Sequence, residues 1–195
     1  MAGDTVAEIP LYLIGRYWRE VVMEKQFPQR KHTRLKSDVY DRAGMYFITV
    51  CTKERSPCMG RIVWEEADIR GTARCVLSPV GVTVLEYLNR VSLTDENASL
   101  DSFVIMPDHV HFLLYLAQGE PSDTVPGAWS PSTYTRMVKI VRSFKTMVTK
   151  KLGYSVWQTS FYDEIIREPA AWPDVRQYIL QNPARWAMRY GGIPE

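Results

Sequence analysis

Apolar positions recur with two different spacings along the chain, and the spacing predicts the elements. Residues 46–52 (YFITVCT) are rich in β-branched and aromatic side chains, which predicts a strand. Residues 80–88 follow a proline and predict a helix. The apolar runs 100–106 and 109–116 are joined by Pro107-Asp108, which predicts an antiparallel hairpin.

In the second half of the chain, helical and strand-like patterns again alternate. Residues 133–152 give the clearest helical pattern, and Gly153 ends it. Residues 157–167 are strand-like again. Pro173 then opens a short helix, which Pro183 is expected to stop or kink.

The order of elements is therefore strand, helix, strand, strand, helix, strand, helix. It predicts an α+β fold with a ferredoxin-like β-α-β-β-α-β core and an additional C-terminal helix. Residues 1–44 mix charges of both signs with weak periodicity and are expected to form an N-terminal basic arm, before a single domain over residues 45–195. The segment 119–132 is a loop to which no role is assigned.

Composition narrows the class of protein only slightly. Hydrophobic residues make up 46% and charged residues 24%, as in folded globular proteins, and the net charge of +2 does not by itself indicate a nucleic-acid binder. The three cysteines show no Cys-x-x-Cys spacing and are expected to be reduced thiols. We expect no signal peptide, no membrane span and an intracellular location.

Two of the three histidines, His109 and His111, are one residue apart inside an apolar run. Residues two apart on a strand share a face, so the imidazoles project together while Val110 and Phe112 face the core. The spacing suits two ring nitrogens that bind one metal ion from a rigid support. The alternative is an incidental pair, with each ring hydrogen-bonded at a sheet surface.

Two histidines do not complete a metal site. Zinc hydrolases need further histidines, and the remaining one, His32, lies in the basic arm, which argues against that class. An open site with two imidazoles and one oxygen ligand suits Mg²⁺ or Mn²⁺ bound partly by a phosphate.

No acidic residue occurs between Asp123 and Asp163, a stretch that contains the helix predicted over 133–152. One face of that helix is apolar, and the opposite face carries Arg136, Lys139, Arg142 and Lys150. A one-sided basic face is typical of proteins that bind phosphate backbones. An ordinary solvated face is the alternative.

Tyr178 and Asn182 are four residues apart on the last predicted helix and share a face. A tyrosine hydroxyl becomes a useful nucleophile when a metal or a polarised phosphate is beside it, and Asn182 could offer its amide oxygen to the same ion. Because Val175 and Ile179 flank Tyr178, the alternative is a core aromatic.

Several short motifs resemble those of the single-tyrosine HUH transposases, most closely the REP-associated tyrosine transposases. The resemblance covers roughly residues 30–187 and keeps the order and approximate spacing of the motifs. They are RLK at 34–36, YFITVCTKER at 46–55, FVIMPDHVH at 103–111, VRSFK at 141–145, WQ at 157–158, FYDEIIR at 161–167, and YILQNP at 178–183 with Trp186.

The resemblance implies that His109 and His111 hold Mg²⁺ or Mn²⁺ and that Tyr178 attacks a phosphodiester in single-stranded DNA. The products would be a 5′-phosphotyrosine link and a free 3′-hydroxyl, which a second strand end can rejoin. Such relatives recognise a DNA hairpin, act in the bacterial cytoplasm at the nucleoid, and work as monomers or homodimers. The residues expected to bind DNA are Arg34, Lys36, Arg136, Lys139, Arg142, Lys145 and Lys150.

One position departs from the family pattern, because many relatives have a histidine where this chain has Glu164. Glu164 could serve a metal as an oxygen ligand, or it could mark lost activity. The leading alternative is therefore a domesticated hairpin-DNA-binding protein without catalysis. A replication initiator or relaxase and a domain for another anion are further alternatives; initiators often carry lysine where this chain has Gln181 or Asn182.

Overall fold

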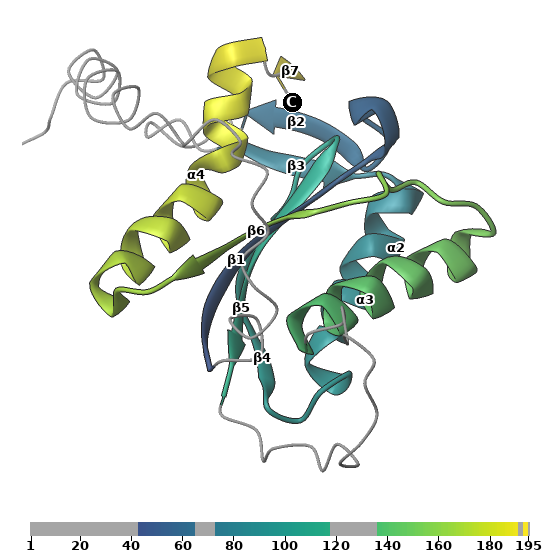
Figure 1. Cartoon of the computed structure of the whole chain (residues 1–195). Helices are drawn as coiled ribbons and strands as arrows, with labels where there is room; N and C mark the ends of the chain where they lie inside the picture. The colour runs from purple at the N-terminus through teal and green to yellow at the C-terminus, as the bar shows by residue number, and fades with distance from the viewer. Residues whose placement is uncertain (1–42, 65–72, 118–135, 191–192, 195) are drawn as a thin grey trace, which may run out of the picture. The chain divides into compact units, whose positions relative to one another are not determined.

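The larger sheet is antiparallel, with its strands in the order β4-β5-β1-β6 (Figure 1). The computed structural model describes residues 43–64, 73–117, 136–190 and 193–194. In the sheet, β1 (Gly44–Cys51) lies between β5 (His109–Leu116) and β6 (Tyr162–Ile166), and β5 also pairs with β4 (Ala98–Ile105). Because β5 is inserted between β1 and β4, the sheet has the split arrangement of the predicted ferredoxin-like fold.

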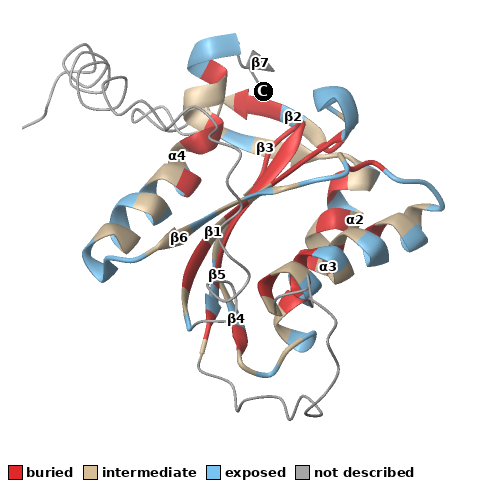
Figure 2. Cartoon of the chain, in the orientation of Figure 1, coloured by how far each residue is buried: buried red, intermediate tan, exposed pale blue. Residues whose placement is uncertain are grey.

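Helices cover both faces of this sheet. α2 (Pro79–Leu88) and α3 (Arg136–Leu152) pack on one face around the larger core, to which β1 contributes Ile48 and β5 contributes Phe112. α4 (Trp172–Tyr190) packs on the other face over a smaller cluster. Since alternate residues point to opposite faces, β1 and β5 are buried on both sides, as the red strands of Figure 2 show.

Local chemistry fixes the start of α2 and the end of α3. Ser78 caps α2, because its Oγ accepts a hydrogen bond from the backbone N–H of Gly81 at 3.1 Å. A Cβ at Gly81 would lie 2.0 Å from the carbonyl oxygen of Met59, so α2 can approach that segment only with glycine there. Gly153 ends α3 with φ +80°, as its sequence position predicted.

A second sheet, which the sequence did not predict, has the strand order β3-β2-β7. β2 (Gly60–Trp64) and β3 (Ala73–Leu77) are antiparallel, and β7 (Ile193–Pro194) runs parallel to β2. β2 and β3 are five residues long, and each carries an exposed arginine between apolar residues. Such short runs give a weak strand pattern, and pairing and contacts with α4 stabilise them.

The expectation that Pro183 stops the last helix is wrong. α4 is 19 residues long and continues to Tyr190 with Pro183 inside it. Proline removes one intrahelical hydrogen bond, but the second half of α4 packs against the β2–β3 hairpin, where Ala187 is 3% exposed and lies in a cluster with Ile62 and Met106. Tertiary burial therefore outweighs the local cost of the proline.

One predicted strand is shorter in the structure than expected, and two predicted segments lie outside the described residues. The strand predicted over 157–167 is confined to β6, and Trp157 instead forms an isolated bridge with Thr52. The predicted arm, apart from its last two residues, and the 119–132 loop lie outside the described residues.

Candidate active site

His109 and His111 lie on β5, on the face of the sheet that α4 covers. Their ring centroids are 4.5 Å apart, with an interplanar angle of 74°. The two residues are only 5% and 7% exposed, so neighbouring side chains separate both rings from bulk water. Val110 and Phe112 lie in the core on the opposite face, as the alternation predicted.

Each imidazole is oriented by an oxygen at Nδ1. His109 Nδ1 lies 2.5 Å from Oδ1 of Asp108, and His111 Nδ1 lies 2.8 Å from Oγ1 of Thr49. When Nδ1 donates to such an oxygen, Nε2 is left unprotonated and can bind a metal. Burial, reinforced by the charges of His109 and Arg55, holds the pKa of His111 well below its ordinary value. The ring is therefore neutral, as a ligand must be.

The tight turn that follows β1, at residues 52–55, contacts Asp108 through both backbone and side chain. The carbonyl oxygen of Asp108 accepts a hydrogen bond from the backbone N–H of Thr52 at 2.9 Å, and Arg55 Nε lies 3.2 Å from Asp108 Oδ2. Glu54 and Arg55 have φ of 53° and 57°, in the left-handed region that non-glycine residues avoid. A conformation of this kind costs about 1–3 kcal/mol per residue, and residues held in it cluster at functional sites.

Tyr178 lies on α4 over the same face of the sheet. Its ring centroid is 5.7 Å from that of His111 and 5.9 Å from that of Phe47, both in edge contacts. The guanidinium carbon of Arg185 lies 5.1 Å from the ring centroid of Tyr178. The tyrosine is half-buried at the margin of the cluster beneath α4, so it packs like a core aromatic and still lies beside the histidines.

The next two turns of α4 continue the stripe that faces the sheet. Asn182, four residues after Tyr178, is 8% exposed. Trp186, four residues further on, has its ring centroid 6.0 Å from that of His109. Because residues four apart share a helix face, α4 presents a phenol, an amide and an indole along one line.

Glu164 lies on β6 and is exposed. In the β1–β6 register its Cα partner is Phe47, whose ring is stacked on His111 at 5.1 Å. Residues directly opposite each other in a sheet share a face, so Glu164 is on the face of the histidines, one strand beyond Phe47.

The side chains of this face suit a divalent ion that is bound only partly by the protein. In the described ranges no group of three or more His, Cys, Asp and Glu could hold a metal. The two imidazoles and the amide oxygen of Asn182, which is 8% exposed on the same stripe of α4, are groups of the kind that bind such an ion. Such a donor set leaves positions for phosphate oxygens, as in Mg²⁺ and Mn²⁺ sites that bind nucleotides.

Sequence reasoning gave no role to the residues that surround this pair, although all five lie in motifs that carry the family resemblance: Phe47, Thr49, Arg55, Asp108 and Trp186. The motifs and the adjacency of Asp108 to His109 were the signals that could have pointed to them. Thr49 is opposite His111 in the strand register, so it could be found only after β1 and β5 were paired. Arg55 and Trp186 reach the site through the fold.

The predicted DNA-binding residues do not share one environment. α3 carries five of them, and it packs on the other face of the sheet from the histidines (Figure 1). Lys139, Arg142 and Lys150 are exposed, as expected of groups that meet a phosphate backbone. Arg34 and Lys36 lie outside the described residues.

Two of the predicted DNA-binding residues on α3, Arg136 and Lys145, make contacts within the protein. Arg136 makes a two-pronged ion pair with Asp95, with Nε–Oδ2 and Nη2–Oδ1 distances of 2.6 and 2.7 Å. Lys145 Nζ donates to the carbonyl oxygens of Gln158 at 2.8 Å and Thr159 at 3.0 Å. These contacts give both side chains a structural role, whatever they do for DNA.

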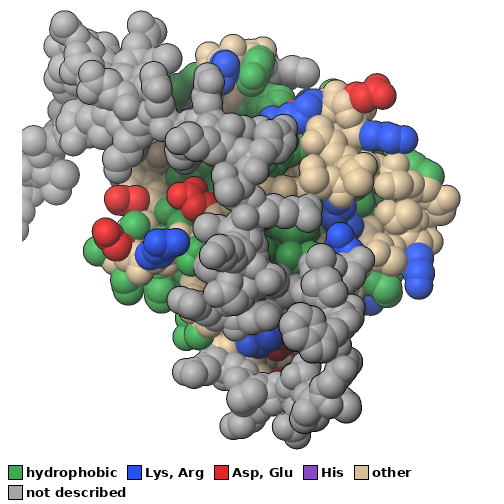
Figure 3. Space-filling model, viewed as in Figure 1, with side chains coloured by type: hydrophobic (Ala, Val, Ile, Leu, Met, Phe, Trp, Pro, Cys, Tyr) green, Lys and Arg blue, Asp and Glu red, His purple; other side chains and the backbone are tan. Residues whose placement is uncertain are grey.

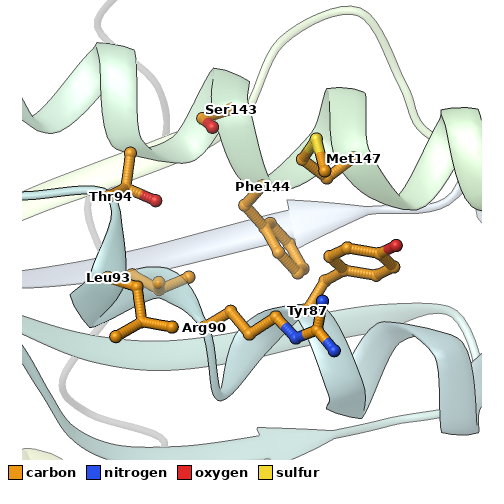
Figure 4. A pocket seen from close by; sticks show the side chains of 8 residues that line it. Tyr87, Arg90, Leu93, Thr94, Ser143, Phe144 and Met147 are labelled. Atoms are coloured by element: carbon orange, nitrogen blue, oxygen red, sulfur yellow. The ribbon is translucent and has the colours of Figure 1, made fainter.

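A pocket of about 290 Å³ opens beside α3, on the face away from the histidines (Figure 4). Tyr87 and Phe144 line it, and Arg90, whose guanidinium lies over the Tyr87 ring at 5.3 Å, is its charged side chain. In Figure 3 the visible Lys and Arg side chains predominate on the side of α3, whereas Asp and Glu gather beside α4 and β6. On the face seen in Figure 3, the described surface is thus more basic on the side of α3.

No helix among the described residues is both long and apolar enough to cross a membrane.

The chain is 28% identical over 169 residues to an uncharacterized protein of Haemophilus influenzae, a match that covers 80% of this chain and 89% of that protein. It is 22% identical over 149 residues to a protein of the same organism that is named provisionally as a REP-associated tyrosine transposase, covering 75% and 73%.

Two solved structures are also similar. The REP-associated tyrosine transposase bound to a REP hairpin has a TM-score of 0.49 and 16% identity, over 82% of this chain and 74% of that one. A provisionally named transposase from Deinococcus radiodurans has a TM-score of 0.40 and 15% identity, over 80% and 96%. Finally, residues 42–182 match the family described as IS200-like transposases, which is most of the chain and includes both histidines, Tyr178 and Asn182. The chain belongs to the IS200-like transposase family.

Proposed function

We propose that this protein is a metal-dependent nuclease of the transposase type that cleaves and rejoins single-stranded DNA through Tyr178. The observation that carries the proposal is the 5.7 Å separation between the ring centroids of Tyr178 and His111 on one face of the sheet. Membership of a transposase family gives DNA as the substrate class. This distance supports the proposal because it brings the phenol ring of Tyr178 next to His111, one of the two side chains that we propose bind the metal.

In the proposed reaction, the phenol oxygen of Tyr178 attacks the phosphorus of a phosphodiester. A bond forms between phosphorus and the phenol oxygen, and the bond from phosphorus to the 3′ oxygen breaks. The phenol loses one proton and the leaving 3′ oxygen gains one, so the step needs no other reactant. Because the product is again a phosphodiester, a second 3′-hydroxyl can reverse the step and join a different strand.

His109, His111 and the amide oxygen of Asn182 would hold a divalent ion. When bound, Mg²⁺ or Mn²⁺ supplies positive charge that stabilises the negative charge of the phosphate during attack. Thr49 and Asp108 orient the two rings through Nδ1. These contacts fix the ligand atoms before substrate binds, which lowers the cost of assembling the site.

The fold also restricts the position of the nucleophile. Tyr178 lies on a 19-residue helix packed over the sheet, with Phe47 at the edge of its ring and Arg185 over it. A phenol held in this way loses little freedom on reaching the reactive geometry. The guanidinium of Arg185 adds positive charge where a phosphate would approach.

The partner we propose is single-stranded DNA beside a hairpin. The exposed cations Lys139, Arg142 and Lys150 offer a basic surface for the backbone, and one relative is named provisionally as a REP-associated tyrosine transposase. Such a protein would act at the bacterial nucleoid, in the cytoplasm. A monomer and a homodimer are both compatible with this site.

The test is formation of a covalent protein–DNA adduct. Fluorescent hairpin oligonucleotides with single-stranded flanks, taken from palindromic repeats beside the gene, are incubated with protein and Mg²⁺ or Mn²⁺ and resolved on a denaturing gel. Wild-type protein should give a shifted band that chelation abolishes, and Tyr178→Phe should give none. Tyr162→Phe is the matched control, because Tyr162 is a partly exposed tyrosine opposite Thr49 on the same sheet. An adduct that persists in Tyr178→Phe contradicts the proposal.

A second candidate function is hairpin binding without cleavage. The observation that favours it is Glu164, an exposed carboxylate on the face of the histidines, at a position where the family resemblance leads us to expect a histidine. It predicts tight hairpin binding by wild-type protein and no adduct with either metal. The same gel, combined with a binding titration, separates the two functions.

A further inference from the structure

We propose that Arg55 is a positioning residue for the imidazole of His109, which it reaches through the carboxylate of Asp108. This inference rests on the proposed function, because it identifies what orients one of the two rings proposed to bind the metal. It concerns a side chain that lies 54 positions before His109 in the sequence and is brought to it by the fold.

The contacts form a continuous chain of charged groups. Arg55 Nε lies 3.2 Å from Asp108 Oδ2, and the other carboxylate oxygen, Oδ1, lies 2.5 Å from His109 Nδ1. Asp108 is 5% exposed, so its negative charge requires a partner inside the protein. Arg55 supplies that partner from a guanidinium whose side chain is 51% exposed. The two carboxylate oxygens of Asp108 thus have different partners: Oδ2 contacts Arg55, and Oδ1 contacts the imidazole of His109.

A second contact fixes the direction of the guanidinium. Arg55 Nη1 lies 3.0 Å from Sγ of Cys51, and Cys51 is the residue opposite His109 in the β1–β5 register. Arg55 therefore holds the end of β1 and the turn before β5 together at the site. A planar guanidinium with two fixed partners can orient a carboxylate more tightly than a single ammonium can.

The backbone of the turn is held in a conformation that serves this contact. Glu54 and Arg55 both have φ in the left-handed region, although neither is glycine. The turn is tied on both sides, since Thr52 N–H donates to the carbonyl oxygen of Asp108 at 2.9 Å and Lys53 N–H donates to that of Val156 at 2.8 Å. Strain that the surroundings enforce next to a metal-binding side chain points to a functional constraint rather than to an ordinary loop.

The experiment measures Mn²⁺ binding by full-length protein in the absence of DNA, from the electron paramagnetic resonance signal of the free ion. Arg55→Ala should weaken binding about tenfold, the lower end of the range for partners outside the ligand shell. Arg55→Lys, which keeps the charge but cannot contact both Asp108 and Cys51 through a planar guanidinium, should restore part of the affinity. Lys53→Ala is the matched control, because it removes an exposed cation from the same turn and should change the dissociation constant less than twofold.

A second readout does not need the metal. Nitrogen-15 NMR of the imidazoles reports which ring nitrogen carries the proton, and with three histidines in the chain the signals are readily assigned. In wild-type protein His109 should be protonated at Nδ1, and Arg55→Ala should give a mixture of the two tautomers while circular dichroism is unchanged. If Arg55→Ala keeps both the wild-type tautomer and the wild-type affinity, the inference is overturned.

The two proposals fail in different ways. Wild-type protein that binds no Mn²⁺ would contradict the proposed function, and the NMR measurement would still decide whether Arg55 orients His109. If Arg55→Ala does not fold, Arg55→Lys and Asp108→Asn are compared instead. The inference is overturned if both variants have the Mn²⁺ dissociation constant and the His109 tautomer of wild-type protein.

Discussion

Cations that look alike in the sequence have different surroundings in the folded protein. Arg136 is paired with Asp95, and its Nη1 also donates to the carbonyl oxygen of Ala117 at 2.9 Å. Burial, together with the nearby charge of Arg142, lowers the pKa of Lys145, whose ammonium is held by backbone carbonyls. Lys139 and Arg142 are exposed. The sequence therefore identified which residues are charged, but the contacts that each side chain makes in the folded protein determine its role.

The Asp95–Arg136 pair predicts a dependence of stability on pH. The hydrogen bonds from Arg136, more than any other contact, hold the pKa of Asp95 below its ordinary value. A carboxylate whose folded pKa is below its unfolded pKa, about 3.9, stabilises the protein fully above the unfolded value and loses that contribution as the pH falls through the folded one. Asp95→Asn should therefore lower the free energy of unfolding by about 1–2 kcal/mol at pH 7.

Urea unfolding of wild type and Asp95→Asn between pH 3 and pH 7 checks this. The difference in the free energy of unfolding between wild type and Asp95→Asn should be constant from pH 7 to about pH 5 and should shrink below about pH 4. Glu96→Gln, a change of an exposed neighbouring carboxylate, is the control and should have little effect. A difference that persists undiminished into acid would mean that the ion pair is not its cause.

Among the elements, α4 connects the two sheets of the domain. Its first half lies over the larger sheet, where Ile179 is fully buried and Arg176 forms an ion pair with Asp101 on β4. Its second half lies on the β2–β3 hairpin through Ala187. Tyr178 and Asn182 belong to the stretch between these contacts, so packing at both ends of the helix fixes their place over the histidines.

Charge placed on the buried side of α4 should break this connection. Ala187→Glu buries a carboxylate without a partner beside Ile62 and Met106, and we expect it to destabilise the protein by about 3 kcal/mol or more. Met188→Glu introduces the same charge one residue later, at a position that is 70% exposed, and should change stability by no more than about 0.5 kcal/mol. Urea unfolding of both variants provides the comparison. Equal effects would show that the second half of α4 does not depend on this packing.

In the domain as a whole, the candidate active site and the basic helix lie on opposite faces of one sheet. α4 covers the face with the histidines, and α3 covers the other (Figure 1). A DNA strand that meets both must pass an edge of the sheet, or different parts of the DNA must meet the two faces. Binding of the backbone and cleavage should therefore be separable by mutation.

Charge reversal on α3 tests this separation. The double variant Lys139→Glu, Arg142→Glu should weaken binding to a hairpin oligonucleotide and lower the slope of log affinity against log salt by about 2, since each lost phosphate contact removes about 0.9. Its Mn²⁺ dissociation constant should equal that of wild type, because α3 does not touch the site. Arg61→Glu, at an exposed position on β2, is the single-site control. An unchanged salt slope in the double variant would mean that these cations do not contact the backbone.

Much of the fold followed from the sequence because its signals are local. The alternation on residues 46–52 and 109–116, the proline at the start of α2 and the glycine after α3 each set an element by near-neighbour chemistry, and all four elements are confirmed. β2 and β3 were missed because five-residue strands with exposed arginines have little local pattern. The end of α4 was wrong because Pro183 is a local stop signal that contacts with a distant hairpin override.

The sequence by itself determined the candidate site residues: two histidines on one strand face, and a tyrosine and an asparagine one helical turn apart. Those relations depend on the repeat of a strand and of a helix, which the order of residues fixes. Only the tertiary structure decided that the two groups meet, that Thr49 and Asp108 orient the rings, and that Arg55 reaches Asp108. Such contacts join residues far apart in the chain, and their distances are set by how the sheet pairs and how the helices pack on it.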